Sequence, residues 1–405
     1  MRGNPNGQAA PRQIANTHVH LPPNFSAFET AAEAVRRAAV EGLAAIGASN
    51  YHDFHVYRAF AEAAQVEGVT ALFGLEVIAL LDDLQREGTL VNDPSNPGRA
   101  YLCGKGIMRF AQPTDVATGL VAEMRAASDQ RMHEMTNRMA ECFAVAGLAT
   151  DCSDSVIVAN EAARSNVPPA WVALQERHIA RAFQEVLFRE LPPERRTRFL
   201  ATLFGAPPSA SPTDADAVQE EIRSRLMKAG RPAFVPDAPV SFDDAYRLIL
   251  ELGGIPCYPT LADGASPICP FEDPPRELAD RLLGRQVYCA ELIPGRNRQG
   301  VVDEYVAALR GAGILVMAGT EHNTQRMIPL APTCAAGEAL SELALDAFWE
   351  GACVVAAHQW RVASGQPGYV DAAGRLNSAY EDDATRIRAF RELGAELIRA
   401  GASGR

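Results

Sequence analysis

The sequence lacks the features of a membrane, secreted or nucleic-acid-binding protein. Its longest apolar stretches, such as residues 311–319, are far shorter than the roughly 20 residues that a membrane-spanning helix requires, and its N-terminus has no apolar signal core. Basic residues are in deficit, with 38 Lys and Arg against 50 Asp and Glu and a net charge of -12. Because nucleic-acid backbone binding needs a basic face, no duplex partner is expected. We predict a cytoplasmic protein that acts on a small molecule.

The sequence also lacks any C-x-x-C pair. Eight cysteines are present, several of them inside apolar runs, at positions 103, 142, 152, 257, 269, 289, 334 and 353. This pattern argues against a zinc ribbon or a disulfide scaffold and predicts reduced, buried thiols.

Segments with the residue spacing of strands and segments with the residue spacing of helices alternate over most of the chain. After a leader at 1–13 that is too polar to order itself, strands are predicted at 14–18, 44–49 and 70–75 and helices at 30–42 and 56–67. The alternation resumes at 242–318, and residues 114–235 have helical spacing almost throughout. This order favours an α/β fold: a barrel-like domain with a parallel sheet over 14–113 and 236–365, a helical insert at 114–235 and a helical tail at 366–405.

The most informative residues are the histidines, of which there are only eight. His18 and His20 lie two apart on a predicted strand, and this spacing projects both imidazoles to the same side. One metal ion takes two nitrogen ligands from one strand in this way. The strand is also the first of an α/β chain, where active-site residues gather at the carboxyl ends of strands.

Three later predicted strands end in comparable residues. His52 follows the second, Glu76 the third, and Glu321-His322 the last apolar strand. Each also has an ordinary interpretation: Glu76 as a salt-bridge partner, His52 as a polar residue at a helix N-terminus, Glu321-His322 as an exposed turn. Together they predict a His/Glu site for Zn²⁺, Mn²⁺ or Fe²⁺.

The remaining histidines are weaker candidates for the metal site. His55 is interpreted as a helix-surface residue, and His133 and His178 as packing residues or substrate contacts within the insert. His358 ends an apolar, strand-like run, so it is either a hydrogen-bonded core residue or part of the pocket lining.

With these residues in hand, the chain resembles the PHP (polymerase and histidinol phosphatase) family, specifically its small-phosphoesterase branch. The order of motifs matches over most of residues 14–325: 16–20 resembles the first, 51–53 the second, 74–77 the third and 319–323 the last. The resemblance implies a distorted (β/α)7-type barrel that binds up to three metal ions and hydrolyses a phosphate ester.

The chain departs from that family at several ligand positions. Tyr51 stands where the family has Asp, Tyr101 and Tyr258 stand where it has His, and its closing Asp-x-His is represented by Glu321 and Asn323, with His322 one place early. We therefore expect one or two ions rather than three. They would be bound by His18, His20, Glu76 and the Glu321-His322 pair, with His52 holding a second ion and Asp263 or Tyr258 replacing a missing histidine.

The expected activity is metal-dependent hydrolysis of a small phosphorylated substrate, such as a nucleotide or sugar phosphate. His52, Arg296 and His178 are the candidate catalytic residues, and Arg296, Arg177 and Arg326 are candidate phosphate-binding cations. Two alternatives stay open: metal-dependent hydrolysis or lyase chemistry on a non-phosphate small molecule, and a degenerate binding module without catalysis.

Overall fold

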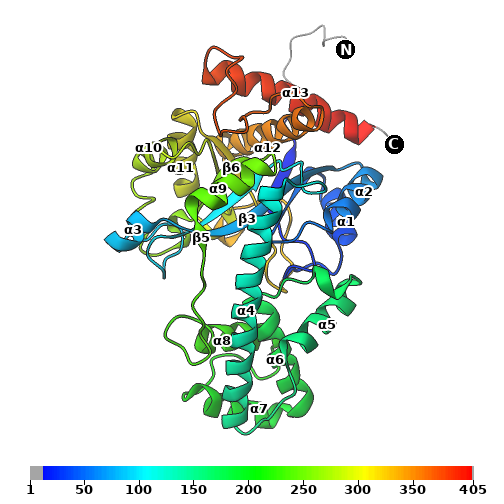
Figure 1. Cartoon of the computed structure of the whole chain (residues 1–405), viewed down its shortest axis with the longest axis vertical. Coiled ribbons are helices and arrows are strands. Elements are labelled where there is room, and N and C mark those ends of the chain that lie inside the picture. Colours follow the sequence, from blue (N-terminus) through cyan, green and yellow to red (C-terminus); the bar gives the residue numbers. More distant parts are fainter. Residues whose placement is uncertain (1–11, 404–405) are drawn as a thin grey trace.

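A barrel-shaped sheet forms the centre of the molecule (Figure 1). The computed structural model describes residues 12–403, so residues 1–11 of the predicted leader lie outside the described part. Seven strands follow one path in the order β1-β2-β3-β4-β6-β7-β8, and the short β5 pairs with β3. Their bounds are β1 (Ile14–Val19), β2 (Leu43–Asn50), β3 (Thr70–Leu80), β4 (Arg99–Lys105), β5 (Val240–Ser241), β6 (Ile255–Thr260), β7 (Cys289–Leu292) and β8 (Leu315–Ala318).

The segment that follows β8 nearly closes the barrel against β1. The backbone N–H of Glu321 donates to the carbonyl of His18 at 2.9 Å, and the N–H of His20 donates to the carbonyl of Glu321 at 2.8 Å. Gly319 permits this approach, since a Cβ there would stand 2.3 Å from that of His18. The predicted barrel-like α/β fold is therefore confirmed.

One strand runs against the predicted direction. β4 is antiparallel to both of its neighbours, β3 and β6, whereas the sequence pattern predicted a parallel sheet. The connection from β3 contains only the six-residue helix α3 (Asp82–Glu87) and returns at the same sheet edge, where the N–H of Leu81 donates to the carbonyl of Gly98 at 2.8 Å. A return of this kind makes an antiparallel pair, because no helix crosses over the sheet.

Helices cover the outside of the barrel, and two of them, those that follow Thr30 and Ser241, begin at side-chain caps. At α1, for example, the Thr30 hydroxyl accepts from the backbone N–H of Glu33. The helices of this layer are α1 (Ala31–Val40), α2 (Tyr57–Glu67), α9 (Phe242–Glu251), α10 (Pro275–Leu283) and α11 (Gln299–Gly311). The expected helical periodicity of these segments is confirmed.

The amino-terminal end of the barrel is covered by α12 (Glu342–Ala363), against which α13 (Asp383–Ser403) packs. The strand-like interpretation of the run before His358 was wrong: this run is helical, and it is apolar all round because α12 is enclosed by the strands and α13. The predicted tail helix is confirmed as α13.

The opposite end of the barrel faces the helical insert. Figure 1 shows α4 as a long stem that leaves the barrel and enters a separate lobe. The lobe has its own apolar core, which includes Met132, Phe143, Phe183 and Ile222. Its helices are α4 (Asp115–Val145), α5 (Asp154–Ser165), α6 (Glu176–Glu190), α7 (Pro193–Phe204) and α8 (Ala215–Leu226), with short 3-10 turns such as Pro169–Trp171 between them.

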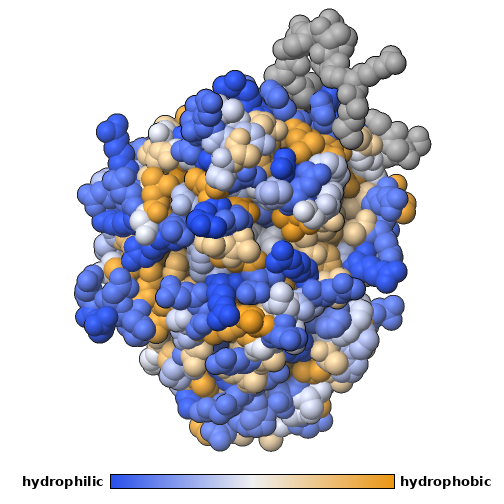
Figure 2. Space-filling model, turned by 45° about the horizontal axis from the view of Figure 1, so that its top comes forward, coloured by the Kyte–Doolittle hydropathy of each residue, from blue (hydrophilic) through white to orange (hydrophobic). Residues whose placement is uncertain are grey.

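The face drawn in Figure 2 mixes hydrophilic and hydrophobic residues, with the apolar ones broken into small groups. Within residues 12–403, no helix combines the length and apolar character needed to cross a bilayer. All eight cysteines are free and all but Cys142 are buried, as predicted.

Candidate metal centre

The site begins with two imidazoles at the end of β1. His18 lies in the strand and His20 just beyond it, and the two-residue spacing turns both side chains into the barrel. Their Nε2 atoms are 3.4 Å apart, and each residue is only 1% exposed. The Nδ1 atom of His20 has no hydrogen-bond partner among the described residues.

A carboxylate from β3 completes the group. Glu76 Oε2 lies 3.2 Å from His18 Nε2 and 3.8 Å from His20 Nε2. Its other oxygen, Oε1, accepts a hydrogen bond from the Tyr51 hydroxyl, which fixes the carboxylate's orientation. Cys103, the β4 residue paired with Glu76 across the sheet, brings its sulfur within 4.8 Å of the His18 and Glu76 ligand atoms.

This geometry fits a single divalent ion. In a tetrahedral site with bonds of about 2.0–2.1 Å, neighbouring ligand atoms stand roughly 3.3 Å apart. The separations of 3.2, 3.4 and 3.8 Å between the atoms of His18, His20 and Glu76 bracket that value. Two imidazoles and one carboxylate are also a ligand set that zinc sites use, with further positions left for water or substrate.

The electrostatic surroundings shift the pKa values of the two imidazoles in opposite directions. Burial, and after it the adjacent His18, lowers the pKa of His20 to about 3, so His20 is neutral and offers a lone pair. Burial also works against a charged His18, but the Glu291 carboxylate outweighs it and raises the pKa to about 9. Protonated His18 then donates a hydrogen bond from Nε2 to the Glu76 carboxylate. A divalent ion bound at this point would replace that proton.

A second layer holds His18 from behind. Glu291, inside β7, accepts from His18 Nδ1 at 2.8 Å and forms an ion pair with Lys105 Nζ at 2.6 Å. A carboxylate on the far nitrogen of a ligating imidazole fixes the ring and raises its basicity. Lys105, Glu291 and Cys103 were missed by the sequence interpretation. The available signals were a lone Glu in a short apolar strand and the alternation that puts Cys103 and Lys105 on one face of β4.

Glu321 lies at the barrel mouth rather than within hydrogen-bond distance of the imidazoles. Its carboxylate accepts from Arg296, and from Asn323 Nδ2 at 2.6 Å. Burial alone would raise the pKa of Glu321, but Arg296 outweighs it and lowers the pKa, with His18 and His20 contributing in the same direction. Glu321 thus faces the centre as a charged group, and its ion pair with Arg296 places that guanidinium at the barrel mouth as well.

The structure does not bring His322 to the predicted site. Both Glu321 and His322 have positive φ, 61° and 52°, in the left-handed region that non-glycine residues rarely occupy. This turn sends the His322 ring away, where its nitrogens contact the Thr320 hydroxyl at 2.8 Å and the Ile328 carbonyl at 3.0 Å. With both nitrogens engaged, His322 is not available as a ligand here.

Three other proposed site residues also stand apart. His178 is fully buried, and its Nδ1 accepts from the backbone N–H of Gln175 at 3.0 Å, which caps α6 and leaves no nitrogen for a substrate. Tyr258 donates to Glu272, and Asp263 pairs with Arg298, so neither replaces a missing histidine.

His52 and the remaining histidines are placed as follows. His52 forms no hydrogen bond with the His18 group, its Nδ1 is buried without a partner among the described residues, and burial together with Arg125 lowers its pKa to about 4. His55 is exposed and stacks on Trp171. His133 pairs with Asp154 on the insert surface. His358 donates to the Gly253 carbonyl, so the core interpretation of this residue is the right one.

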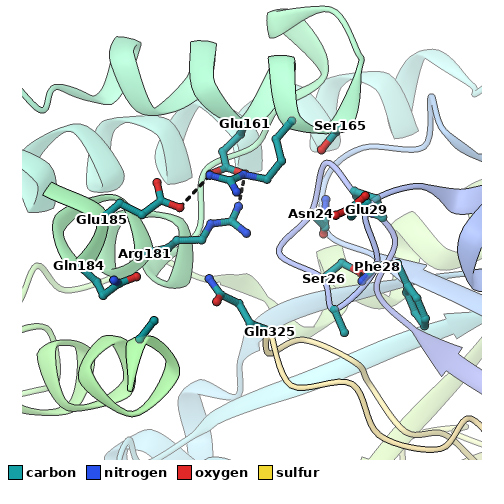
Figure 3. A pocket seen from close by; sticks show the side chains of 14 residues that line it. Asn24, Ser26, Phe28, Glu29, Glu161, Ser165, Arg181, Gln184, Glu185 and Gln325 are labelled. Atoms are coloured by element: carbon teal, nitrogen blue, oxygen red, sulfur yellow. Dashed lines mark hydrogen bonds and ion pairs between the residues drawn. The ribbon is translucent and has the colours of Figure 1, made fainter. Parts of the chain in front are cut away.

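A polar cavity lies between the barrel mouth and the insert (Figure 3). It has a volume of about 370 Å³ and is bounded on one side by residues 22–29, which follow His20, and on the other by α5 and α6. The loop is tied to the metal centre, since the Ser26 hydroxyl donates to the His20 carbonyl at 2.7 Å. Arg181 and Gln184 line the α6 side, and Gln325, shortly after Glu321, reaches the same space.

Comparisons with known proteins support the fold class. No protein-family model matches the chain, and no curated protein matches it. Among solved structures, a candidate metal-dependent phosphoesterase from Bifidobacterium adolescentis superposes with a TM-score of 0.54 at 15% identity, covering 84% of this chain and 96% of that one. An amidohydrolase from Chromobacterium violaceum, solved with sulfate and no metal, gives 0.49 at 18% identity over 80% and 93% of the two chains. At these identities the first likeness establishes a shared barrel architecture.

Proposed function

We propose that this protein is a metal-dependent hydrolase of the PHP kind that cleaves a small phosphate ester. The observation that carries the proposal is the convergence of His18, His20 and Glu76, from two strands, at separations suited to one divalent ion. A solved structure with the same fold is described as a candidate metal-dependent phosphoesterase, which agrees with this assignment.

A divalent ion at this position would lower the pKa of a bound water toward neutrality and polarise the scissile group. The chain's own residues prepare the site for it. Tyr51 orients the Glu76 carboxylate and Glu291 orients the His18 ring, so both ligands are fixed before anything binds. The burial of all three ligands excludes bulk water from their inner side.

Arg296 is the best-placed cation for the phosphate oxygens. Its guanidinium pairs with Glu321 at the mouth, and this carboxylate raises its pKa, so it stays charged at any pH of interest. Planar guanidinium groups bind phosphate oxygens in pairs, which a lysine cannot do. Arg177, on α6, pairs with Glu220 but also interacts electrostatically with Glu321, so the insert extends positive charge toward the same point.

The cavity in Figure 3 is suited to the uncharged part of the substrate. Its lining has the two cations Arg164 and Arg181, which are already paired with Glu161 and Glu185. Glu29 adds a third carboxylate, so the lining is negative overall and disfavours a second phosphate. Gln184, which is 4% exposed and forms no hydrogen bond to a described residue, offers both a donor and an acceptor. A hydroxyl-rich or amide-bearing group fits this chemistry.

A second candidate function is hydrolysis or lyase chemistry on a non-phosphate substrate at the same centre. The observation that favours it is the Arg296–Glu321 pair, because a phosphate must compete with this carboxylate for the guanidinium. A neutral ester or amide would leave the pair intact.

A substrate panel separates these functions. Protein purified without chelator and supplied with Mn²⁺ or Zn²⁺ is assayed on p-nitrophenyl phosphate, nucleoside monophosphates and sugar phosphates, and in parallel on carboxylic esters and amides. Phosphate release that disappears with EDTA and returns with metal supports the first function. Turnover confined to the second set supports the alternative, and bound metal without any turnover indicates a binding module.

A further inference from the structure

Behind the ligand group, Glu291 is a completely buried carboxylate that receives three donors from two strands, β1 and β4. His18 Nδ1 lies 2.8 Å and Lys105 Nζ 2.6 Å from its oxygens, and the thiol of Cys103 donates to it as well. Its exposed fraction is 0%. A carboxylate with this environment stays ionised, and Lys105, the strongest influence against the burial penalty, lowers its pKa.

Lys105 itself is an unusual residue for the inside of a barrel, where apolar side chains normally fill the layers. It is 2% exposed, and its ammonium group contacts Glu291, the carbonyl of Thr17 at 3.1 Å and the hydroxyl of Ser49 at 3.3 Å. These three contacts use all three ammonium protons. Burying an ammonium ion costs several kcal/mol, so its position next to a metal centre calls for an electrostatic reason.

The charges of the centre supply that reason. The carboxylates of Glu76, Glu291 and Glu321 face the guanidinium of Arg296 and the ammonium of Lys105, so with neutral histidines the group sums to one negative charge. One divalent ion changes this to one positive charge, which a hydroxide or an anionic substrate balances. Two divalent ions would leave three positive charges in a buried space, at a steep electrostatic cost.

We infer that the Lys105 ammonium is a resident cation that takes the place of a second metal ion, and that it limits the centre to a single ion. In this arrangement Glu291, which could otherwise ligate a second ion, is held by Lys105, and the Cys103 thiol is held by Glu291. Glu291 is thereby left to position His18. The inference rests on the proposed metal-dependent function and narrows it from one or two ions to one.

Metal stoichiometry of the full-length protein tests this inference. Metal-free wild-type protein titrated with Co²⁺ is expected to bind one equivalent, with no thiolate-to-cobalt charge-transfer band. Lys105→Ala is expected to bind a second equivalent and to gain that band, because Glu291 and Cys103 are released. Adding Cys103→Ser should remove the band again. Lys228→Ala, which changes a lysine on the insert, is the matched control and should titrate like wild type.

A second variant covers the case in which Lys105→Ala does not fold. In Lys105→Met with Glu291→Gln both buried charges are replaced together, which avoids an uncompensated ion. This variant should still bind only one equivalent, about 10- to 100-fold more weakly, because His18 loses its carboxylate partner.

The outcomes separate the inference from the function on which it rests. Two tight equivalents in the wild type, or a Lys105→Ala variant that folds but binds one equivalent without the new band, overturn the role of Lys105 and leave the hydrolase proposal standing. No metal binding by the wild type overturns both.

Discussion

The barrel and the insert hold their charged residues in different ways. In the barrel, Lys105, Glu291 and His18 come from three strands and are fully buried in a fixed chain of contacts. In the insert, Glu176 is surrounded by Arg131, Arg223 and Lys228 from neighbouring helices, all partly exposed. These cations outweigh the effect of burial and lower the pKa of Glu176 to about 2. Strands that converge on one axis fix a catalytic geometry, whereas a half-exposed helical network can adjust to a ligand.

The apolar cores of the two regions are also separate. The insert residues from Met132 to Val235 cluster with one another, whereas Ala117 and Met124, at the start of α4, belong to a barrel cluster. We therefore propose that the barrel binds the metal and that the insert selects the substrate. The four predictions below test this division, beginning with the largest expected effect.

Replacing both imidazoles, His18→Ala with His20→Ala, should abolish metal retention, because two of the three ligand side chains are lost and no other residue on β1 can substitute. Elemental analysis of protein purified without chelator measures this directly. His133→Ala, which removes an exposed histidine on the insert, is the matched control and should keep its metal. Full metal content in the double variant would refute the ligand assignment.

Phe183→Ala should destabilise the insert by about 3–5 kcal/mol, the usual cost of deleting a buried aromatic ring. Phe183 is fully buried and meets Phe143 edge to face at 4.8 Å. Hydrogen exchange should rise in α4–α8 but not in the barrel strands, and metal content should not change. Val145→Ala, at an exposed position of α4, serves as control. Loss of metal from Phe183→Ala would contradict the division between the two regions.

Arg296→Ala should lower kcat/KM for a phosphate ester by roughly 100-fold, or about 2.7 kcal/mol, the scale found when one preorganised donor to a developing charge is removed. Arg298, two residues away, is 77% exposed at its side chain and pairs with Asp263. Arg298→Ala should therefore leave kcat/KM near wild type. Equal losses in the two variants would show that the effect belongs to the loop and not to the guanidinium.

The smallest effect is expected from His358, in the core at the other end of the barrel. Burial lowers its pKa to about 4 from an ordinary value near 6.5, so the unfolded chain binds more protons between these values and stability falls as pH drops from 6.5 to 4. His358→Gln should be about 1–2 kcal/mol less stable at pH 7, since it loses its bonds to Gly253 and Tyr369.

That gap should narrow at pH 4.5, because His358 is protonated in the unfolded chain and largely neutral in the folded one, so the wild type loses its advantage. Urea unfolding at both values measures the two gaps, with His133→Gln as the exposed control. A gap that is the same at pH 7 and pH 4.5 would show that His358 does not titrate in this window.

The sequence pattern was informative wherever a residue's role depends on its own strand or helix. The two-residue spacing placed His18 and His20 on one side of β1, and the tail periodicity predicted α13. The pattern gave the wrong secondary structure for the apolar run before His358, which is enclosed on all sides. An apolar run of this length is compatible with either a buried helix or a strand. The pattern also predicted a parallel sheet and did not identify β4, whose antiparallel direction is set by how the connection from β3 returns.

Within the candidate site, residue order alone predicted the proposed ligands: two imidazoles two residues apart and a carboxylate in the third strand. Only the tertiary structure decided that Lys105 and Glu291 meet behind His18, and that the left-handed backbone at Glu321 and His322 turns the last histidine away. The physical reason is that local spacing fixes the direction of a side chain relative to its own strand, whereas barrel closure and strand register fix which side chains from distant strands share a buried point.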